Sequence, residues 1–203
     1  YDNPCGAYVT HFESDNDYRK YLNFEGVDSC FYVWVNGEFV GYSQVSHSTS
    51  EFDITDKVKN GDNTLCVLVF KWCDGSYLED QDKFRMSGIF RDVYILNRPQ
   101  KHILDYKIET DIQGKINIEI DSDIDVSFVL ENEKGEIYSG DSKTITVEKP
   151  ILWNAEYPYL YTLYLVTEDE VIREKIGFRE IKIDDGIVFL NNKPIKMKGV
   201  NRH

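Results

Sequence analysis

The sequence lacks several residue patterns on which enzymes commonly depend. Its four histidines include no pair at metal-ligand spacing, so a zinc site is not expected. A G-x-S-x-G nucleophile elbow and a glycine-rich phosphate loop are both missing. These absences leave zinc chemistry, serine-based acyl transfer and phosphate binding without support in the sequence.

Cysteine and positive charge are also scarce. The four cysteines show no C-x-x-C spacing, and Cys30 and Cys66 lie within apolar runs, so free buried thiols are expected rather than disulfides. The 23 Lys and Arg residues against 36 Asp and Glu give a net charge of -13, which disfavours nucleic acid and membrane surfaces as partners. Since the chain shows neither a leader nor a bilayer-spanning run, a cytoplasmic location is expected.

Short runs of aromatic and β-branched residues dominate instead. A hydrophobic content of 41%, with 14% aromatic residues, predicts an all-β protein with an apolar core. The run 31–42 has Asn-Gly at its centre, which predicts a hairpin with a type I′ turn. Residues 64–72 (TLCVLVFKW) predict a central strand, and residues 89–96 predict another.

Closely spaced strands follow Pro99, which is typical of an immunoglobulin-like sandwich. Within residues 115–120, three isoleucines alternate with polar residues and predict one buried face. A hairpin is expected at Asp185-Gly186 and a further turn at Asn191-Asn192. The chain therefore predicts two β-sandwiches followed by a short tail.

The polar segment 73–88 is the strongest candidate for a binding site, because loops between core strands carry binding groups. Residues 74–82 hold four carboxylates, which suit either a hard cation and sugar hydroxyls or a merely solvated acidic loop. Trp72, Tyr77 and Phe84 could stack on a sugar ring, but their place beside a core strand favours burial in the core.

Three polar residues near this segment have ordinary structural interpretations. Arg85 and Arg91 are expected to pair with nearby carboxylates. Asn3 precedes Pro4, so its side chain is expected to bond neighbouring backbone in a turn. None of these residues indicates a function by itself.

Several stretches, in order along the chain, resemble lacZ-type β-galactosidases of glycoside hydrolase family 2. The longest is DGSYLEDQD at 74–82 with RMSGIFRD at 85–92, which is similar to the signature loop of the family's N-terminal domain. The other stretches are NPCG at 3–6, VWVNG at 33–37 with VGY at 40–42, LWNAE at 152–156 with PYLY at 158–161, IGFRE at 176–180, and LNNKP at 190–194 with KGVNRH at 198–203.

This resemblance implies a domain plan. Residues 1–98 would form a jelly-roll-like galactose-binding sandwich, incomplete at its N-terminus, so that its sheet has an exposed edge. Residues 99–178 would form an immunoglobulin-like β-sandwich. Residues 179–203 would be the lead-in and first strand of a truncated (β/α)8 catalytic barrel.

The resemblance also implies a function for the whole protein. It would be a retaining β-galactosidase that hydrolyses terminal β-D-galactosyl residues of β-galactosides such as lactose, assembles as a homo-oligomer and uses sodium and magnesium. Both catalytic glutamates and the magnesium ligands are expected beyond His203. This chain would then supply scaffold and part of the galactose and sodium subsite, and be inactive alone.

Three residues of the chain are implicated in that subsite by the resemblance. Asp82 would be both a sodium ligand and a contact to the galactosyl hydroxymethyl group, since a carboxylate serves a hard cation and a hydroxyl equally well. Asn3 would reach into the sugar subsite, and His203 would hydrogen-bond a ring hydroxyl. All three would bind the sugar, and none would break a bond.

The sequence departs from the familiar bacterial pattern only in neighbouring residues. Cys5 and Cys73 occupy variable positions, and Lys83-Phe84 stands where Met-Trp is familiar. The alternative function is that of a stand-alone carbohydrate-binding β-sandwich module. The barrel-like tail argues against this alternative.

Overall fold

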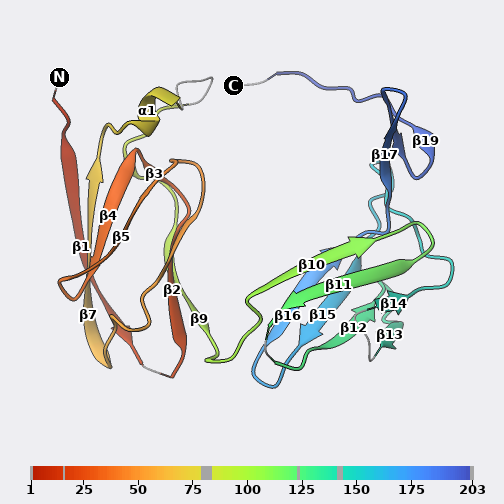
Figure 1. The fold of residues 1–203 in the computed structure, drawn as a ribbon, viewed down its shortest axis with the longest axis horizontal. Helices are drawn as coiled ribbons and strands as arrows, with labels where there is room; N and C mark the ends of the chain where they lie inside the picture. The colour runs from red at the N-terminus through yellow and green to blue at the C-terminus, as the bar shows by residue number, and fades with distance from the viewer. Residues whose placement is uncertain (1, 16, 79–83, 123, 141–143, 202–203) are drawn as a thin grey trace. The chain divides into compact units, whose positions relative to one another are not determined.

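The computed structural model describes residues 2–15, 17–78, 84–122, 124–140 and 144–201. Within these ranges the regular elements are β-strands apart from one short helix, α1 (Gly75–Leu78), which confirms the predicted all-β class (Figure 1). No helix in this part of the chain is long and apolar enough to cross a membrane. Contacts divide the chain into two compact units, Tyr1–Gln100 and Lys101–Asn201.

The first unit is a sandwich of antiparallel sheets. Its larger sheet has four strands in the order β1 (Cys5–Ser14), β7 (Gly61–Phe70), β4 (Cys30–Val35) and β5 (Glu38–Gln44). The smaller sheet has three, in the order β6 (Ser50–Asp53), β2 (Arg19–Phe24) and β9 (Val93–Arg98), and a short pair joins β3 (Val27–Asp28) to β8 (Gly88–Ile89).

The core of this unit lies between the two sheets because both contribute alternate apolar residues to it. Phe31, Val33 and Val35 of β4 are buried, whereas the residues between them face outward. Phe24 of β2 meets Phe31 with ring centroids 4.8 Å apart. Burial of these rings and branched side chains stabilises each by about 1.5–3 kcal/mol relative to exposure.

The predicted hairpin forms between β4 and β5. Asn36 and Gly37 have φ values of 53° and 82°, the positive pair that a type I′ turn requires, which confirms the Asn-Gly prediction. The prediction of one unbroken strand over 89–96 was wrong. The chain forms β8 and β9 instead, and the carbonyl of Asp92 between them accepts a hydrogen bond from Glu25.

Strand β1 lies at one end of the larger sheet, where among the described residues it pairs only with β7. Its outer side is therefore an open edge of ten residues. Several of its side chains are exposed, including Val9. An open edge of this length offers unpaired backbone groups to another strand.

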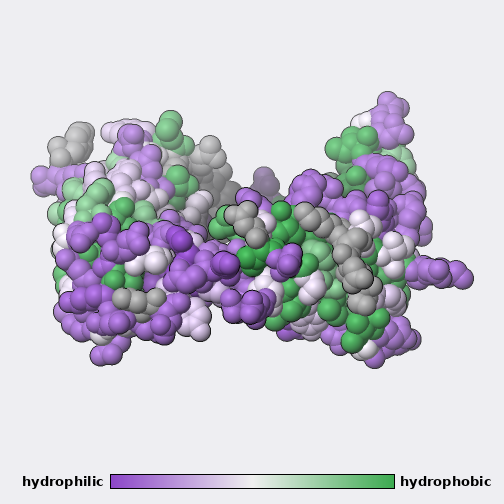
Figure 2. Space-filling model, turned by 60° about the horizontal axis from the view of Figure 1, so that its bottom comes forward, coloured by the Kyte–Doolittle hydropathy of each residue, from purple (hydrophilic) through white to green (hydrophobic). Residues whose placement is uncertain are grey.

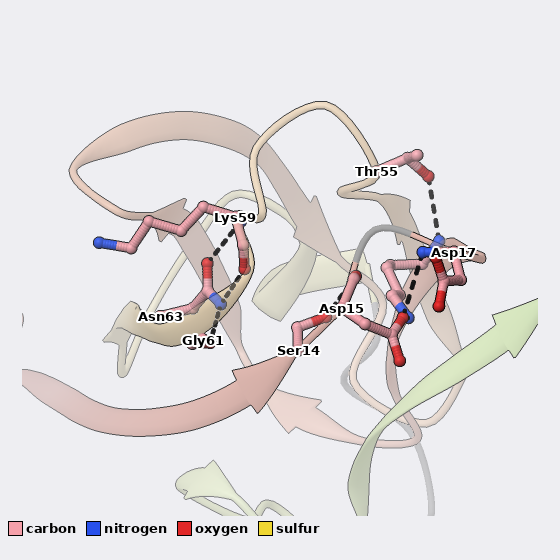
Figure 3. Close-up of polar contacts among 8 residues, drawn as sticks. Ser14, Asp15, Asp17, Thr55, Lys59, Gly61 and Asn63 are labelled. Carbon is pink, nitrogen blue, oxygen red and sulfur yellow. Dashed lines mark hydrogen bonds and ion pairs between the residues drawn. The ribbon is translucent and has the colours of Figure 1, made fainter.

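Buried polar groups close one end of the first unit. Figure 3 shows the fully buried amide of Asn63, which donates to the carbonyls of Lys59 and Gly61 at 2.8 Å each. The buried ammonium of Lys20 contacts Asp15 at 2.7 Å, so its charge has a partner at the surface. Such groups are tolerated in a small domain because each is hydrogen-bonded.

The second unit contains two facing sheets and a smaller one. One facing sheet has three strands in the order β10 (Asp105–Thr110), β11 (Lys115–Asp121) and β14 (Thr144–Thr146). The other has four strands in the order β13 (Ile137–Gly140), β12 (Ser127–Glu131), β15 (Tyr161–Val166) and β16 (Val171–Ile176). Ile116 and Ile118 are buried and Ile120 packs against the same core, which confirms the predicted alternation. Figure 2 shows both units, and hydrophilic residues cover much of the visible face, as expected for a chain with 29% charged residues.

The tail forms the third sheet of the second unit, β17 (Ile181–Asp184), β18 (Ile187–Leu190) and β19 (Lys193–Pro194). Positive φ angles at Asp185-Gly186 and Asn191-Asn192 confirm both predicted turns. The Asn191 amide donates to the carbonyl of Trp153 at 2.9 Å, which ties the hairpin to the sandwich. That residues 179–203 begin a catalytic barrel stays a prediction.

Candidate functional site

The segment that leaves β7 carries the candidate site. After Phe70 the chain turns through Trp72 and Cys73 into helix α1, which Figure 1 shows beyond the ends of the larger sheet. The Asp74 carboxylate accepts a hydrogen bond from the backbone of Gly75 at 2.8 Å, a local bond that favours the turn into the helix. Asp74 is exposed, whereas Gly75 and Ser76 are buried.

Asn3 lies directly against the start of this segment. Its amide nitrogen donates to the carbonyl of Trp72 at 2.9 Å, and its amide oxygen accepts from the Trp72 backbone nitrogen, also at 2.9 Å. The next residue, Pro4, accepts a hydrogen bond from the Lys71 backbone at 3.0 Å. The expected backbone bonding of Asn3 is therefore present, but with a partner 69 positions away rather than in a local turn.

The Asn3 amide retains capacity for a ligand. It has two N–H donors and two acceptor lone pairs, and the reciprocal contact with Trp72 occupies one of each. Asn3 is exposed, so a remaining donor and acceptor are available to solvent or to a bound hydroxyl group. The contact fixes the amide in one orientation, which lowers the entropy lost on binding.

A buried hydroxyl network anchors the first turn of α1 to the sandwich. Ser76 donates to the hydroxyl of Ser29 at 3.1 Å and accepts from the Cys73 backbone at 3.1 Å. Ser29 lies within 2.7 Å of the Asp28 carboxylate, which also accepts from Ser46 at 3.1 Å. The sequence analysis did not predict this network because its members come from three separate segments. The only indication in the sequence was the polar pair Asp28-Ser29 between apolar residues.

Two cations lie close to the Trp72 ring. The Lys71 ammonium lies 5.4 Å from the indole centroid and the Arg85 guanidinium lies 5.5 Å from it. Arg85 also donates to the carbonyl of Ser76 at 3.0 Å, and Lys71 contacts the Ser87 hydroxyl. Both cations thus tie the far end of the loop, at 85–87, to its beginning.

The core prediction for three aromatic residues was wrong. Trp72 is 43% exposed, Phe84 75% and Tyr77 87%, so none of them belongs to the core. The reason is that β7 ends at Phe70 and the chain then leaves the sandwich. Exposed aromatic rings beside hydrogen-bonding groups suit recognition of a ligand that has both apolar and polar faces.

The predicted arginine pairing is replaced at Arg91 by bonds to backbone. Arg91 donates to the carbonyls of His47 at 3.3 Å and Glu25 at 3.5 Å, and its guanidinium lies 5.5 Å from the Phe90 ring centroid. Arg91 therefore links its own segment of the first unit to the segments that carry Glu25 and His47. All four cysteines are free as predicted, although only Cys30 is fully buried.

Of the predicted site residues, the structure describes Asn3 alone. Asp82 and His203 lie outside the described residues, so their distances to Asn3 and their ligands stay predictions. Among the described residues, no group of three or more His, Cys, Asp and Glu side chains is arranged to hold a metal ion. The described part shows a hydrogen-bonded group at the start of the segment 73–88, in which Asn3 bonds to Trp72 and Ser76 bonds to the Cys73 backbone.

Two family models match the chain. Residues 1–99 match the model for glycosyl hydrolases family 2, sugar binding domain, and residues 92–179 match the model for glycosyl hydrolases family 2. Thus the first match covers the unit that carries Asn3 and the loop, and the second covers the following sandwich.

Curated relatives match over the whole chain. A β-galactosidase of Actinobacillus pleuropneumoniae is 50% identical over 215 residues, covering 100% of this chain and 21% of that protein. A β-galactosidase of Staphylococcus xylosus is 49% identical over 217 residues, covering 100% of this chain and 22% of that protein. The chain therefore spans about a fifth of the length of these relatives.

Solved structures share the fold at lower identity. A Ruminococcus gnavus β-glucuronidase superposes with a TM-score of 0.84 at 22% identity, covering 95% of this chain and 38% of that one. At this identity the likeness concerns the fold alone. The matching models, the end-to-end identity to β-galactosidases and the two-sandwich fold lead to one conclusion, that this chain belongs to glycoside hydrolase family 2.

Proposed function

We propose that the whole protein is a retaining β-galactosidase acting on terminal β-D-galactosyl residues of β-galactosides such as lactose, and that this chain supplies scaffold and part of its galactose subsite. The observation that carries the proposal is the 50% identity to a β-galactosidase over the full length of the chain. The 22% identity to a β-glucuronidase supports a shared fold without a shared substrate.

The described contacts support a subsite built around Asn3. Its amide is oriented by Trp72 and keeps a donor and an acceptor for a sugar hydroxyl. The exposed Trp72 ring next to it offers a flat apolar surface to the pyranose ring, and α1 lies within the acidic segment 74–82. A neutral, hydroxyl-rich ligand also suits a chain with a net charge of -13, which would repel an anionic sugar.

Within this proposal, Asp82 binds sodium and the galactosyl hydroxymethyl group, and His203 binds a ring hydroxyl. Sodium would hold that hydroxymethyl oxygen in place as a hard cation does. The remaining sodium ligands, the magnesium ligands and both catalytic glutamates are expected outside this chain. Retaining hydrolysis needs those two carboxyl groups about 5–5.5 Å apart, one as acid and base and one as nucleophile.

The test is hydrolysis of a chromogenic β-galactoside and the matching β-glucuronide by the whole protein and by this chain alone, each with and without sodium and magnesium. We expect the whole protein to prefer the galactoside and to respond to both ions, and the chain alone to be inactive. Preference for the glucuronide would refute the substrate class, and activity of the chain alone would refute the location of the glutamates.

Asp82→Ala in the whole protein tests the subsite. Loss of a charge-assisted hydrogen bond costs about 1.5–3 kcal/mol, so kcat/KM should fall by roughly 10- to 150-fold. Asp62→Ala is the matched control, since this exposed carboxylate lies at the other end of β7 and pairs only with His11 among the contacts seen. Equal activity of the two variants would exclude a role for Asp82 in galactose binding. Homo-oligomerisation and a cytoplasmic location stay predictions.

A further inference from the structure

Two of the four cysteines meet at the base of the loop after β7. The Cys30 thiol at the start of β4 interacts with both the Tyr42 hydroxyl and the Cys73 thiol. Cys73 Sγ lies 3.8 Å from Ser76 Oγ, which lies 3.1 Å from Ser29 Oγ, and Ser29 immediately precedes Cys30. Both sulfurs are reduced, and they belong to segments more than forty positions apart in the chain.

Hydrogen bonds hold the segment before Cys30 next to the segment that leads from β7 to Cys73. The backbone of Ser29 donates to the carbonyl of Phe70 at 3.0 Å, and its hydroxyl lies 2.8 Å from the carbonyl of Lys71. The backbone of Cys73 donates to Ser76 at 3.1 Å. The residues just after β7 and just before β4 are thus held next to each other, which keeps Cys30 and Cys73 in neighbouring segments.

Neither of the other two cysteines lies beside Cys30 in the sheet. Cys5 and Cys30 both lie opposite Phe70 of β7, one on β1 and the other on β4, so two strand spacings, about 9–10 Å, separate them. That distance exceeds the Cα separation of up to about 7 Å that a disulfide tolerates. Cys66 lies four positions before Phe70 along β7 and pairs with Val9 and Trp34.

From this geometry we propose that Cys30 and Cys73 form a dithiol pair that a small-molecule disulfide, such as oxidised glutathione, converts to a protein disulfide. The bond joins the start of β4 to the residue before Asp74. The disulfide would therefore attach the beginning of the acidic segment 74–82 to the sandwich. Formation of the bond does not depend on the proposed galactosidase function, although its position makes that function the property it would modulate.

The two thiols have different roles in the exchange. Cys73 is partly exposed and Cys30 is buried. Burial raises the pKa of the Cys30 thiol, and Cys73 and Asp74 raise it further, whereas the hydrogen bond with Tyr42 acts in the opposite direction. A buried thiol with a raised pKa is a poor first nucleophile, so Cys73 reacts first with the incoming disulfide.

The reaction balances as two successive exchanges. The Cys73 thiolate attacks one sulfur of the small disulfide, breaking its S–S bond and releasing one thiolate, which leaves a mixed disulfide on Cys73. Cys30 then loses its proton to solvent and attacks Cys73 Sγ, releasing the second thiolate. The net change is oxidation of two protein thiols and reduction of one small disulfide to two thiols.

The experiment treats the 203-residue chain with oxidised glutathione, blocks remaining thiols with an alkylating reagent, and measures intact mass and peptide maps. We expect a crosslinked peptide pair containing Cys30 and Cys73, with a mass lower by two hydrogen atoms than the two separate peptides, and no alkylation of either cysteine. Conversion of the mixed disulfide should quicken as pH rises, because the raised pKa of Cys30 limits the second step.

Variants assign each step. Cys30→Ser should stop at a glutathione adduct on Cys73, whereas Cys73→Ser should form no internal disulfide. Cys5→Ser, as the matched control, should crosslink like the parent, and circular dichroism verifies that each variant is folded. A parent chain that keeps four free thiols, stops at the mixed disulfide, or crosslinks through Cys5 or Cys66 would overturn the proposal.

Discussion

Replacement of Asn63 by alanine should strongly destabilise the first unit, although Asn63 lies near the end of a strand, where substitutions usually cost little stability. The side chain is completely buried and makes four hydrogen bonds. It donates to the carbonyls of Lys59 and Gly61 at 2.8 Å, accepts from the Lys59 backbone at 2.9 Å, and accepts from the Asn36 amide at 2.8 Å. Asn36 in turn forms the hairpin turn between β4 and β5.

The magnitude follows from the number of bonds and from the exposure of their partners. At about 1 kcal/mol net for each bond, four bonds set a ceiling of roughly 4 kcal/mol. Lys59 and Gly61 are exposed, so water can replace part of what their backbone groups lose. We therefore expect a loss of about 2–3 kcal/mol. For a unit of about 100 residues this lowers the melting temperature by roughly 8–20 °C.

The assay is urea denaturation of the chain, followed by tryptophan fluorescence and by amide hydrogen exchange. Fluorescence reports mainly the first unit, which holds Trp34 and Trp72, and hydrogen exchange resolves the two units separately. Asn60→Ala is the matched control, because this amide is exposed and should change stability by less than about 0.5 kcal/mol. A loss below about 1 kcal/mol in Asn63→Ala would refute the assignment of the four bonds as a structural unit.

Two other perturbations test separate parts of the fold. Gly114→Ala should lower the melting temperature of the second unit, since its φ is +92° and an added Cβ would lie 2.1 Å from the carbonyl oxygen of Val147. Burial raises the pKa of Asp53, but hydrogen bonds from Thr55 and the Arg19 guanidinium outweigh this and hold that pKa below its usual value. The resulting stability is present above about pH 4 and lost as pH falls through the lowered pKa, so Asp53→Asn should flatten the acid side of the stability profile measured by urea titration.

The sequence was sufficient wherever a local pattern had one low-energy outcome. Asn36-Gly37 specifies its turn because few residues adopt positive φ at both positions. Ile116 and Ile118 specify a buried face because a strand repeats every two residues. The resemblance along the chain likewise needed only the order of its motifs, and it placed the chain in its family before any contact was known.

Tertiary structure decided what depends on residues distant in sequence. Trp72 follows an apolar strand in the sequence, yet it is exposed because the chain leaves the sandwich at Phe70. The bonds of Asn3 to Trp72 and of Ser76 to Ser29, and the approach of Cys73 to Cys30, join segments that only the sheet order brings together. Composition and periodicity fix which face of a strand is buried, but they carry no information on which strands become neighbours, and the base of the candidate site is made from those neighbours.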